Sequence, residues 1–180
     1  MKHSNRAIIA NLAEKHGRQV FQTAYRLLGD SHLAEDVTQE VFLKLFKKSP
    51  AAFDKIQNWP AYLCTMATSA AIDQLRRIKR RSEQPIEQAC AESDSASGPC
   101  STLAQQQDLE RFRRTLTRLS PRDAQVFCLR HIEGLSYQEI AHCVDISTSL
   151  AGVSLHRAQQ KLSQWLGESQ LSGAEHELTY

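Results

Sequence analysis

Basic residues near position 80 are the densest candidate for binding chemistry in this chain. Positions 76–81 are RRIKRR, which places five cations within six residues at the end of an expected helix. Such a cluster binds the phosphates of nucleic acids in a salt-dependent way. Phe53, Trp59 and Tyr62 precede it, and aromatic rings beside a basic track can stack on unpaired bases. The alternatives are a solvated helix end, whose cations favour the helix dipole, and aromatic rings that pack in the core.

A helix-turn-helix pattern between residues 137 and 162 is the second candidate. Its expected packing positions are apolar, and they are Ile140, Ala141, Ile146, Val153 and Leu162. In such a unit the second helix enters the major groove of DNA. The side chains expected on its exposed face are polar or cationic, and they are Thr148, Ser149, Ser154, His156, Arg157 and Lys161. The alternative is an ordinary helical hairpin inside a core.

Catalytic residues show no recognisable arrangement in the sequence. There is no phosphate-binding loop, nucleophile–base pair or metalloprotease motif, and the seven histidines are scattered. Cys128 and His131, together with His142 and Cys143, could supply four zinc ligands. The simpler interpretation is that Cys128 and Cys143 are small buried side chains. We therefore expect no enzymatic activity, no metal and no cofactor.

Composition and charge divide the chain into four parts. Only 7 glycines and 5 prolines occur in 180 residues, so few turns are expected. We predict an all-α fold of two small helical domains (1–81 and 105–166) joined by a flexible linker (82–104), with a tail (167–180). The first domain carries fourteen Lys and Arg against seven Asp and Glu, whereas the linker carries four acids and no base. This asymmetry favours a polyanionic partner for the first domain.

Three or four helices are expected in the first domain, and three of them are placed over 5–28, 33–46 and 60–81. Asp30 or Ser31 would cap the second helix, and Pro60 would open the third. The acids at 35 and 36 would lie in the first turn of the second helix, where the dipole favours anions. The expected apolar positions are Ile8, Leu12, Val20, Ala24, Leu27, Leu28, Leu33, Val37, Val41, Phe42, Leu45, Phe46, Leu63, Met66, Ala70 and Leu75. A loop is expected around Phe53.

Strong helix-start signals mark the second domain. Ser120 precedes proline and an acid, Ser136 and Glu139 form a capping box, and Ser147 would cap a last helix through Leu166. Leu109, Phe112, Leu116 and Leu119 would form the apolar face of its first helix. No run of 18 apolar residues and no apolar leader occur, so we expect no membrane insertion and a cytoplasmic location.

Together these segments resemble the extracytoplasmic-function (ECF) sigma factors, the compact promoter-recognition subunits of bacterial RNA polymerase. YRLLGDSHLAEDVTQEVFLKLF, residues 25–46, is similar to the segment of that family that binds core polymerase. NWPAYLCTMATSAAIDQLRR, residues 58–77, resembles the helix that reads the minus-ten element. LSPRDAQVFCLRHIEGLSYQEIAHCVDIS, residues 119–147, resembles the domain that reads the minus-thirty-five element. The first two segments form one block, the third forms a second block, and two such blocks in this order make a chance match improbable.

The resemblance implies a role for each segment. Core polymerase would be bound by Asp36, Gln39, Glu40, Phe42 and Lys44. The minus-ten element would be bound by Phe53 and Ser69 at a flipped base and by Arg76, Arg77, Arg80 and Arg81 at the phosphates. The upstream element would be bound by the final helix, through Thr148, Ser149, Gly152, Ser154, His156, Arg157 and Lys161. The resemblance also implies an anti-sigma partner, and it places the acidic linker in a positively charged channel of polymerase.

Four positions depart from the family pattern. Ser69 stands where asparagine is usual, so the preferred base can differ. Asp145 replaces a turn glycine, and aspartate tolerates the left-handed conformation better than most residues. Gly152 and Ser154 stand where lysine and arginine are usual. A stand-alone helix-turn-helix regulator, or a helical adaptor that binds only proteins, remains an alternative for the same sequence.

Overall fold

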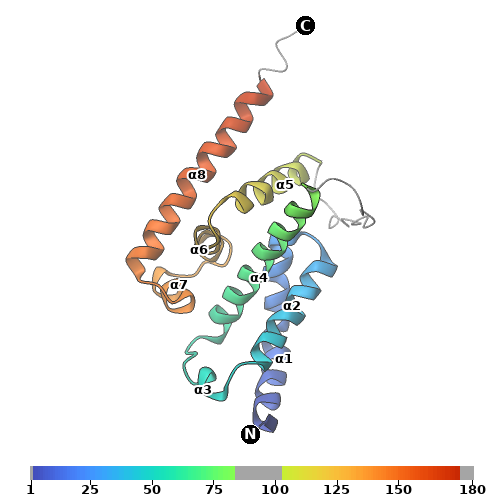
Figure 1. The fold of residues 1–180 in the computed structure, drawn as a ribbon, viewed down its shortest axis with the longest axis vertical. Helices are drawn as coiled ribbons and strands as arrows, with labels where there is room; N and C mark the ends of the chain where they lie inside the picture. Colours follow the sequence, from blue (N-terminus) through green and yellow to red (C-terminus); the bar gives the residue numbers. More distant parts are fainter. Residues whose placement is uncertain (1, 84–102, 175–180) are drawn as a thin grey trace.

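The computed structural model describes residues 2–83 and 103–174, and within those ranges it contains eight helices and no strand (Figure 1). The first range holds α1 (Lys2–Leu28), α2 (Ser31–Phe46), α3 (Pro50–Phe53) and α4 (Trp59–Ser82). The second holds α5 (Leu103–Arg118), α6 (Pro121–His131), α7 (Tyr137–Val144) and α8 (Thr148–Ala174). The predicted all-α class is confirmed. Residues 84–102, most of the predicted linker, lie outside the described residues.

Helices α1, α2 and α4 lie side by side and bury one apolar stripe from each helix (Figure 1). Its largest fully buried side chains include Leu27, Leu45, Leu63 and Ile72. Two expected core positions are wrong. Ile8 is 41% exposed, whereas its neighbour Ile9 is buried, and Phe46 at the end of α2 is 49% exposed. Each lies at the edge of its stripe: Ile9 rather than Ile8 joins the core, and the Arg6 guanidinium lies 5.8 Å from the centre of the Phe46 ring.

Side-chain caps fix where α2 and α4 begin. The Asp30 carboxylate accepts a hydrogen bond from the Leu33 amide at 2.9 Å, and Asn58 Oδ1 accepts one from the Ala61 amide at 3.1 Å. Each cap satisfies a helix-start amide that has no partner within the helix. Since α2 begins at Ser31, the acids at 35 and 36 fall beyond its first turn, contrary to the sequence prediction. The expected loop around Phe53 contains the short helix α3.

The predicted caps of the second range are confirmed. Ser120 Oγ accepts from the Asp123 amide at 3.1 Å, and Ser147 Oγ accepts from the Leu150 amide at 3.1 Å. The capping box at the start of α7 is complete. Two expectations fail. Leu109 is 45% exposed, and α8 continues past the predicted end to Ala174.

The two helical ranges pack against each other through a shared apolar core. Leu116, Leu119 and Cys128 belong to the same buried cluster as the core of α1, α2 and α4. We call the contact between α1–α4 and α5–α8 the interdomain interface. Among the helices of residues 2–83 and 103–174, none is long and apolar enough to cross a membrane.

Arg113 on α5 forms the best-defined polar contact of the interdomain interface. Its Nε donates a hydrogen bond to the Leu27 carbonyl at 2.8 Å. That carbonyl lies in the last turn of α1, where helix carbonyls lack intrahelical partners and favour a cation. Gly29 ends the helix at φ +70°, and a Cβ there would overlap the Arg113 guanidinium. Glycine at this position therefore allows both the turn and the arginine.

Buried thiols lie along the same interface. Burial raises the pKa of Cys64 to about 11, and a hydrogen bond from Thr23 partly opposes this. Burial raises the pKa of Cys128 to about 12. Both thiols are close enough to Glu133 for its charge to raise these values further. They are therefore almost wholly protonated and unreactive at neutral pH.

Candidate nucleic-acid and protein interfaces

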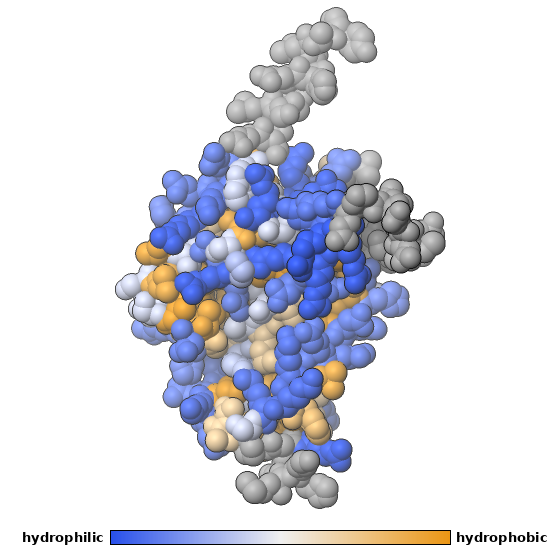
Figure 2. Space-filling model, in the orientation of Figure 1, coloured by the Kyte–Doolittle hydropathy of each residue, from blue (hydrophilic) through white to orange (hydrophobic). Residues whose placement is uncertain are grey.

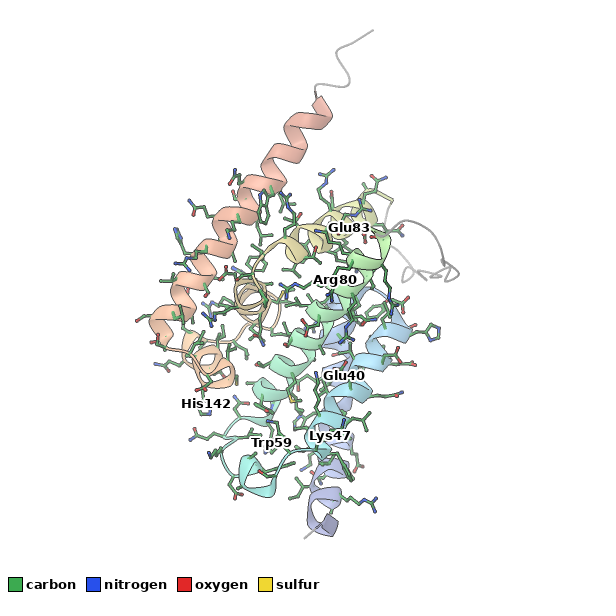
Figure 3. The ribbon with its side chains drawn as sticks, viewed as in Figure 1. Glu40, Lys47, Trp59, Arg80, Glu83 and His142 are labelled. Atoms are coloured by element: carbon green, nitrogen blue, oxygen red, sulfur yellow. The ribbon has the colours of Figure 1, made fainter. Side chains whose placement is uncertain are left out.

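The outer face of α2 carries the side chains expected to contact a protein partner. Asp36 and Gln39 are exposed, and Glu40 forms an ion pair with Lys44 at 2.7 Å while both side chains keep 40% or more of their surface exposed. Figure 3 shows Glu40 along this helix. Phe42 differs from these four because it is partly buried against the core. The polar residues therefore form a solvent-facing surface, with Phe42 behind it.

Leu43 is an apolar member of this face that the sequence analysis missed. Its side chain is 60% exposed, and it follows Asp36 by seven residues and Glu40 by three, which places it on the same side of the helix. A single exposed leucine is common on protein surfaces, so Leu43 is a candidate contact only through its place beside the polar residues of this face. The spacing could have revealed it, because 36, 40 and 43 share one helical face.

The basic end of α4 carries three exposed arginines and one arginine that is hydrogen-bonded to the second range. Arg77, Arg80 and Arg81 are exposed, and Figure 3 shows Arg80 at the end of the helix next to Glu83. Arg76 is only 19% exposed and donates a hydrogen bond to the Leu119 carbonyl at 3.0 Å across the interdomain interface. In this arrangement three of the four expected phosphate contacts are available to DNA, and the fourth holds the two ranges together.

The aromatic residues near α3 are distributed differently from the expectation. Phe53, expected at the pocket for a flipped base, is 8% exposed and packs on Trp59 with ring centroids 5.4 Å apart. Trp59 and Tyr62 remain partly exposed, and the Lys48 ammonium lies 5.5 Å from the centre of the Tyr62 ring. Phe53 is a core residue because it closes the short α3 turn. Ser69 is partly buried in the middle of α4.

A cleft separates this aromatic region from α7. Its volume is about 440 Å³, and its walls come from both ranges. Lys48, Lys55 and Tyr62 line one side, and His142 and Asp145 line the other. Figure 3 shows His142 on α7 near the Trp59 end of α4. In this arrangement α7 lies over the cationic side chains that precede α4 and over Tyr62 in its first turn.

The first half of α8 carries most of the expected DNA-facing residues. Thr148, Ser149, His156, Arg157 and Lys161 are exposed and Gly152 is half-exposed. Ser154 is a wrong prediction because it is 1% exposed. Val153 was expected to pack, and it is 45% exposed. The buried positions 151, 154, 155, 158 and 162 are three or four residues apart where they do not adjoin, so they form one inward face of the helix.

Asp145 forms the turn between α7 and α8 in the left-handed region, at φ 58° and ψ 53°. This conformation disfavours residues with a Cβ. Replacing Asp145 by Gly should raise the stability by about 0.5–1 kcal/mol. Thermal unfolding should show a midpoint about 1–4 °C higher. An unchanged or lower midpoint would contradict the strain assigned to this residue.

The possible zinc cluster does not form a site in this structure. Cys128 is buried in the core, and His131 Nε2 lies 3.0 Å from Gln159 Nε2. No group of three or more His, Cys, Asp and Glu residues in the described part of the chain is arranged to hold a metal ion. The Cys128 thiol is explained by packing alone.

Comparisons with known proteins match both helical ranges. The family model of sigma-70 region 2 matches residues 12–81, and that of sigma-70 region 4 matches residues 109–162. The ECF RNA polymerase sigma factor SigE of Mycolicibacterium smegmatis is 29% identical over 87% of this chain and 61% of its own length. The probable ECF RNA polymerase sigma factor SigI of Mycobacterium tuberculosis is 28% identical over 89% of this chain, which spans 56% of it. SigW of Bacillus subtilis is 24% identical over 92% of both chains.

Solved structures show the same fold. The sigma factor RpoE of Bartonella quintana, crystallised with the anti-sigma factor NepR, matches 86% of this chain and 94% of its own, with a TM-score of 0.54 and 21% identity. CnrH in complex with the cytosolic domain of CnrY matches 93% of this chain and 92% of its own, with a TM-score of 0.56 and 21% identity. A region 2 unit followed by a region 4 unit defines a sigma-70 type protein. The chain belongs to the sigma-70 family as an ECF sigma factor.

Proposed function

We propose that this chain binds core RNA polymerase and directs it to the promoters of a specific set of genes. The observation that carries this proposal is the match to region 2 and region 4 in that order. The exposed α2 face and the two cationic surfaces, at the end of α4 and on α8, support it. The chain would act by binding, in the cytoplasm, where polymerase and DNA meet.

Docking on polymerase would begin at the α2 face. Asp36, Gln39 and Glu40 would supply charge and hydrogen bonds, Lys44 would lie at the edge, and Leu43 would supply apolar contact. Polar groups around an apolar contact orient the two partners and speed their association, whereas the apolar group slows dissociation. Phe42 would support this surface from behind.

DNA binding would follow docking. Polymerase would hold the two domains apart on the promoter, which raises the effective concentration of each for its DNA element. Separation would break the bond from Arg76 to the Leu119 carbonyl and free this arginine for phosphate, beside Arg77, Arg80 and Arg81. Flipping a base out of the duplex costs a few kcal/mol, and contacts near Ser69 and Tyr62 would offset that cost.

An anti-sigma protein is the proposed regulator. The two solved structures described above contain sigma factors bound to such partners or to a cytosolic domain. In this chain, a partner that stabilises the interdomain interface would keep Arg76 occupied and α7 over the cleft. It would therefore inhibit DNA binding without contacting every DNA-binding residue.

Run-off transcription with core polymerase over a promoter library tests the proposed function. We expect selective transcripts only when the chain and core polymerase are both present, together with weak binding of the chain alone to the same DNA. Tight, sequence-specific binding by the chain alone, without stimulation of polymerase, would instead support a stand-alone regulator. Activity that survives replacement of Arg76, Arg77, Arg80 and Arg81 by Ala would support a protein-binding adaptor.

A further inference from the structure

Val153 is the one large apolar side chain among the exposed positions in the first half of α8. It is 45% exposed, its helical neighbours Ser149 and His156 face the same side, and Gly152 lies directly before it, about 100° round the helix. The opposite side of the helix, with Ala151 and Leu155, is buried in the apolar core that α8 shares with α6 and α7. Figure 2 shows an apolar patch within a largely hydrophilic surface at the left of the view, over the first half of α8. Packing within the chain does not explain this valine.

Gly152 is equally unexplained by packing within the chain. A Cβ built on it would meet nothing within 4 Å, and it is absent from the glycines with positive φ. Glycine is among the least favourable residues inside a helix. A glycine that neither the backbone angle nor the neighbours require is explained by a close approach from outside, which a missing side chain allows.

We propose that Gly152 and Val153 form an apolar notch that reads the C5-methyl group of a thymine in the upstream promoter element. The inference deepens the proposed function and rests on it. Residues near the start of the second helix of a helix-turn-helix contact base edges, and Val153 is the sixth residue of α8. In the major groove, thymine alone presents a methyl group, which apolar side chains contact. Gly152 lets the helix backbone come close enough for Val153 to reach it.

DNA is favoured as the occupant because this surface is continuous with cationic side chains. Arg157 follows Val153 by one helical turn and Lys161 by two, and both are exposed. Cations along a helix that fits a groove bind phosphates and fix the register, while the central side chains select the base. Gly152 stands where a cationic side chain is usual in the family, so the notch selects for a methyl group rather than for the acceptor atoms of guanine.

Removing the methyl group from DNA tests the notch without changing the protein. The promoter would be taken from the library selection, and each thymine of its upstream element would be replaced by deoxyuridine, one at a time, on either strand. With polymerase and the wild-type chain, one replacement should weaken promoter binding about fourfold, as expected for one lost methyl contact. With Val153→Ala, the same replacement should have no further effect, because the contact is already gone.

Two further variants separate recognition from folding. Gly152→Ala should raise the thermal midpoint, since alanine favours a helix, and yet weaken promoter binding about tenfold by blocking the approach. Gln22→Ala, at an exposed position on α1 outside the second domain, should match the wild type. Equal deoxyuridine effects in wild type and Val153→Ala, or an upstream element without an A·T pair, would overturn the notch. Failure of the unmodified promoter to direct transcription would instead overturn the proposed function itself, and with it the notch.

Discussion

Reversing the charge of Asp36 and Glu40 together is expected to weaken binding to core RNA polymerase by about 100-fold, or about 2.7 kcal/mol. Both side chains leave the outer face of α2 toward solvent, so their replacement by lysine exchanges attraction for repulsion at the proposed docking surface. The fold should survive, because the new lysine at 40 costs only about 0.5 kcal/mol through repulsion with Lys44. Competition for core polymerase against the labelled wild-type chain measures the effect.

A matched control separates the docking surface from overall charge. Glu14→Lys with Asp108→Lys changes the net charge by the same amount at exposed positions on α1 and α5, and it should compete as the wild type does. Leu43→Ala adds an uncharged test on the same face and should accelerate dissociation with little change in salt dependence. If the reversed variant keeps its secondary structure and competes equally with the wild type, α2 does not dock polymerase.

The sequence allowed the helix starts to be predicted well, because caps are local. Asp30, Ser120, Ser136 and Ser147 each accept a hydrogen bond from the amide three residues ahead, and such short-range geometry is determined by residue type and spacing. The resemblance to the family could also be predicted from the sequence, because the family motifs are continuous segments. These are the features for which one sequence contains all the necessary information.

Polarity was a poor guide to the recognition helix. Ser154 was assigned to the DNA face because it is polar, and Val153 to the core because it is apolar, yet the structure reverses both. A small hydroxyl residue fits a helix contact at little steric cost, so its burial depends on the face of the helix that it occupies rather than on its own type. The i, i+4, i+7, i+11 spacing of Ala151, Leu155, Ala158 and Leu162 would have placed the two residues correctly.

The interdomain interface had no sequence signal. Three of its hydrogen bonds end on backbone carbonyls, at Leu27, Thr65 and Leu119, and every residue type offers the same carbonyl. The donors Arg113, Gln125 and Arg76 lie 43 to 86 residues from their acceptors. Long-range contacts to backbone atoms follow from packing, which hydrophobic periodicity does not specify.

Replacing Arg113 by Ala is expected to shift the chain from the packed arrangement toward separated domains. The guanidinium is largely withdrawn from solvent, with 18% of the side chain exposed, and burial lowers its pKa below the ordinary value. Its hydrogen bond to the Leu27 carbonyl repays part of that desolvation. Loss of a bond to a charged donor costs about 1.5–3 kcal/mol, so the equilibrium should move by about 10- to 150-fold.

Alkylation of Cys64 and Cys128 measures this opening. Their raised pKa values, about 11 and about 12, keep both thiols unreactive while the interface is closed, and contact with water on opening lowers the pKa and speeds the reaction. Peptide mapping of iodoacetamide products distinguishes them from the other cysteines. The faster reaction in Arg113→Ala should occur at a temperature where circular dichroism shows intact helices, so that separation rather than unfolding is detected.

Arg114→Ala is the natural control for this prediction, because the neighbouring arginine is 77% exposed and pairs only locally with Glu110. It should leave the alkylation rates unchanged. Polymerase binding provides an independent readout, since a partner that requires separated domains binds more tightly when that state is more populated. Arg113→Ala should therefore bind core polymerase more tightly than Arg114→Ala does. Equal alkylation and equal affinity in the two variants would mean that Arg113 does not hold the domains together.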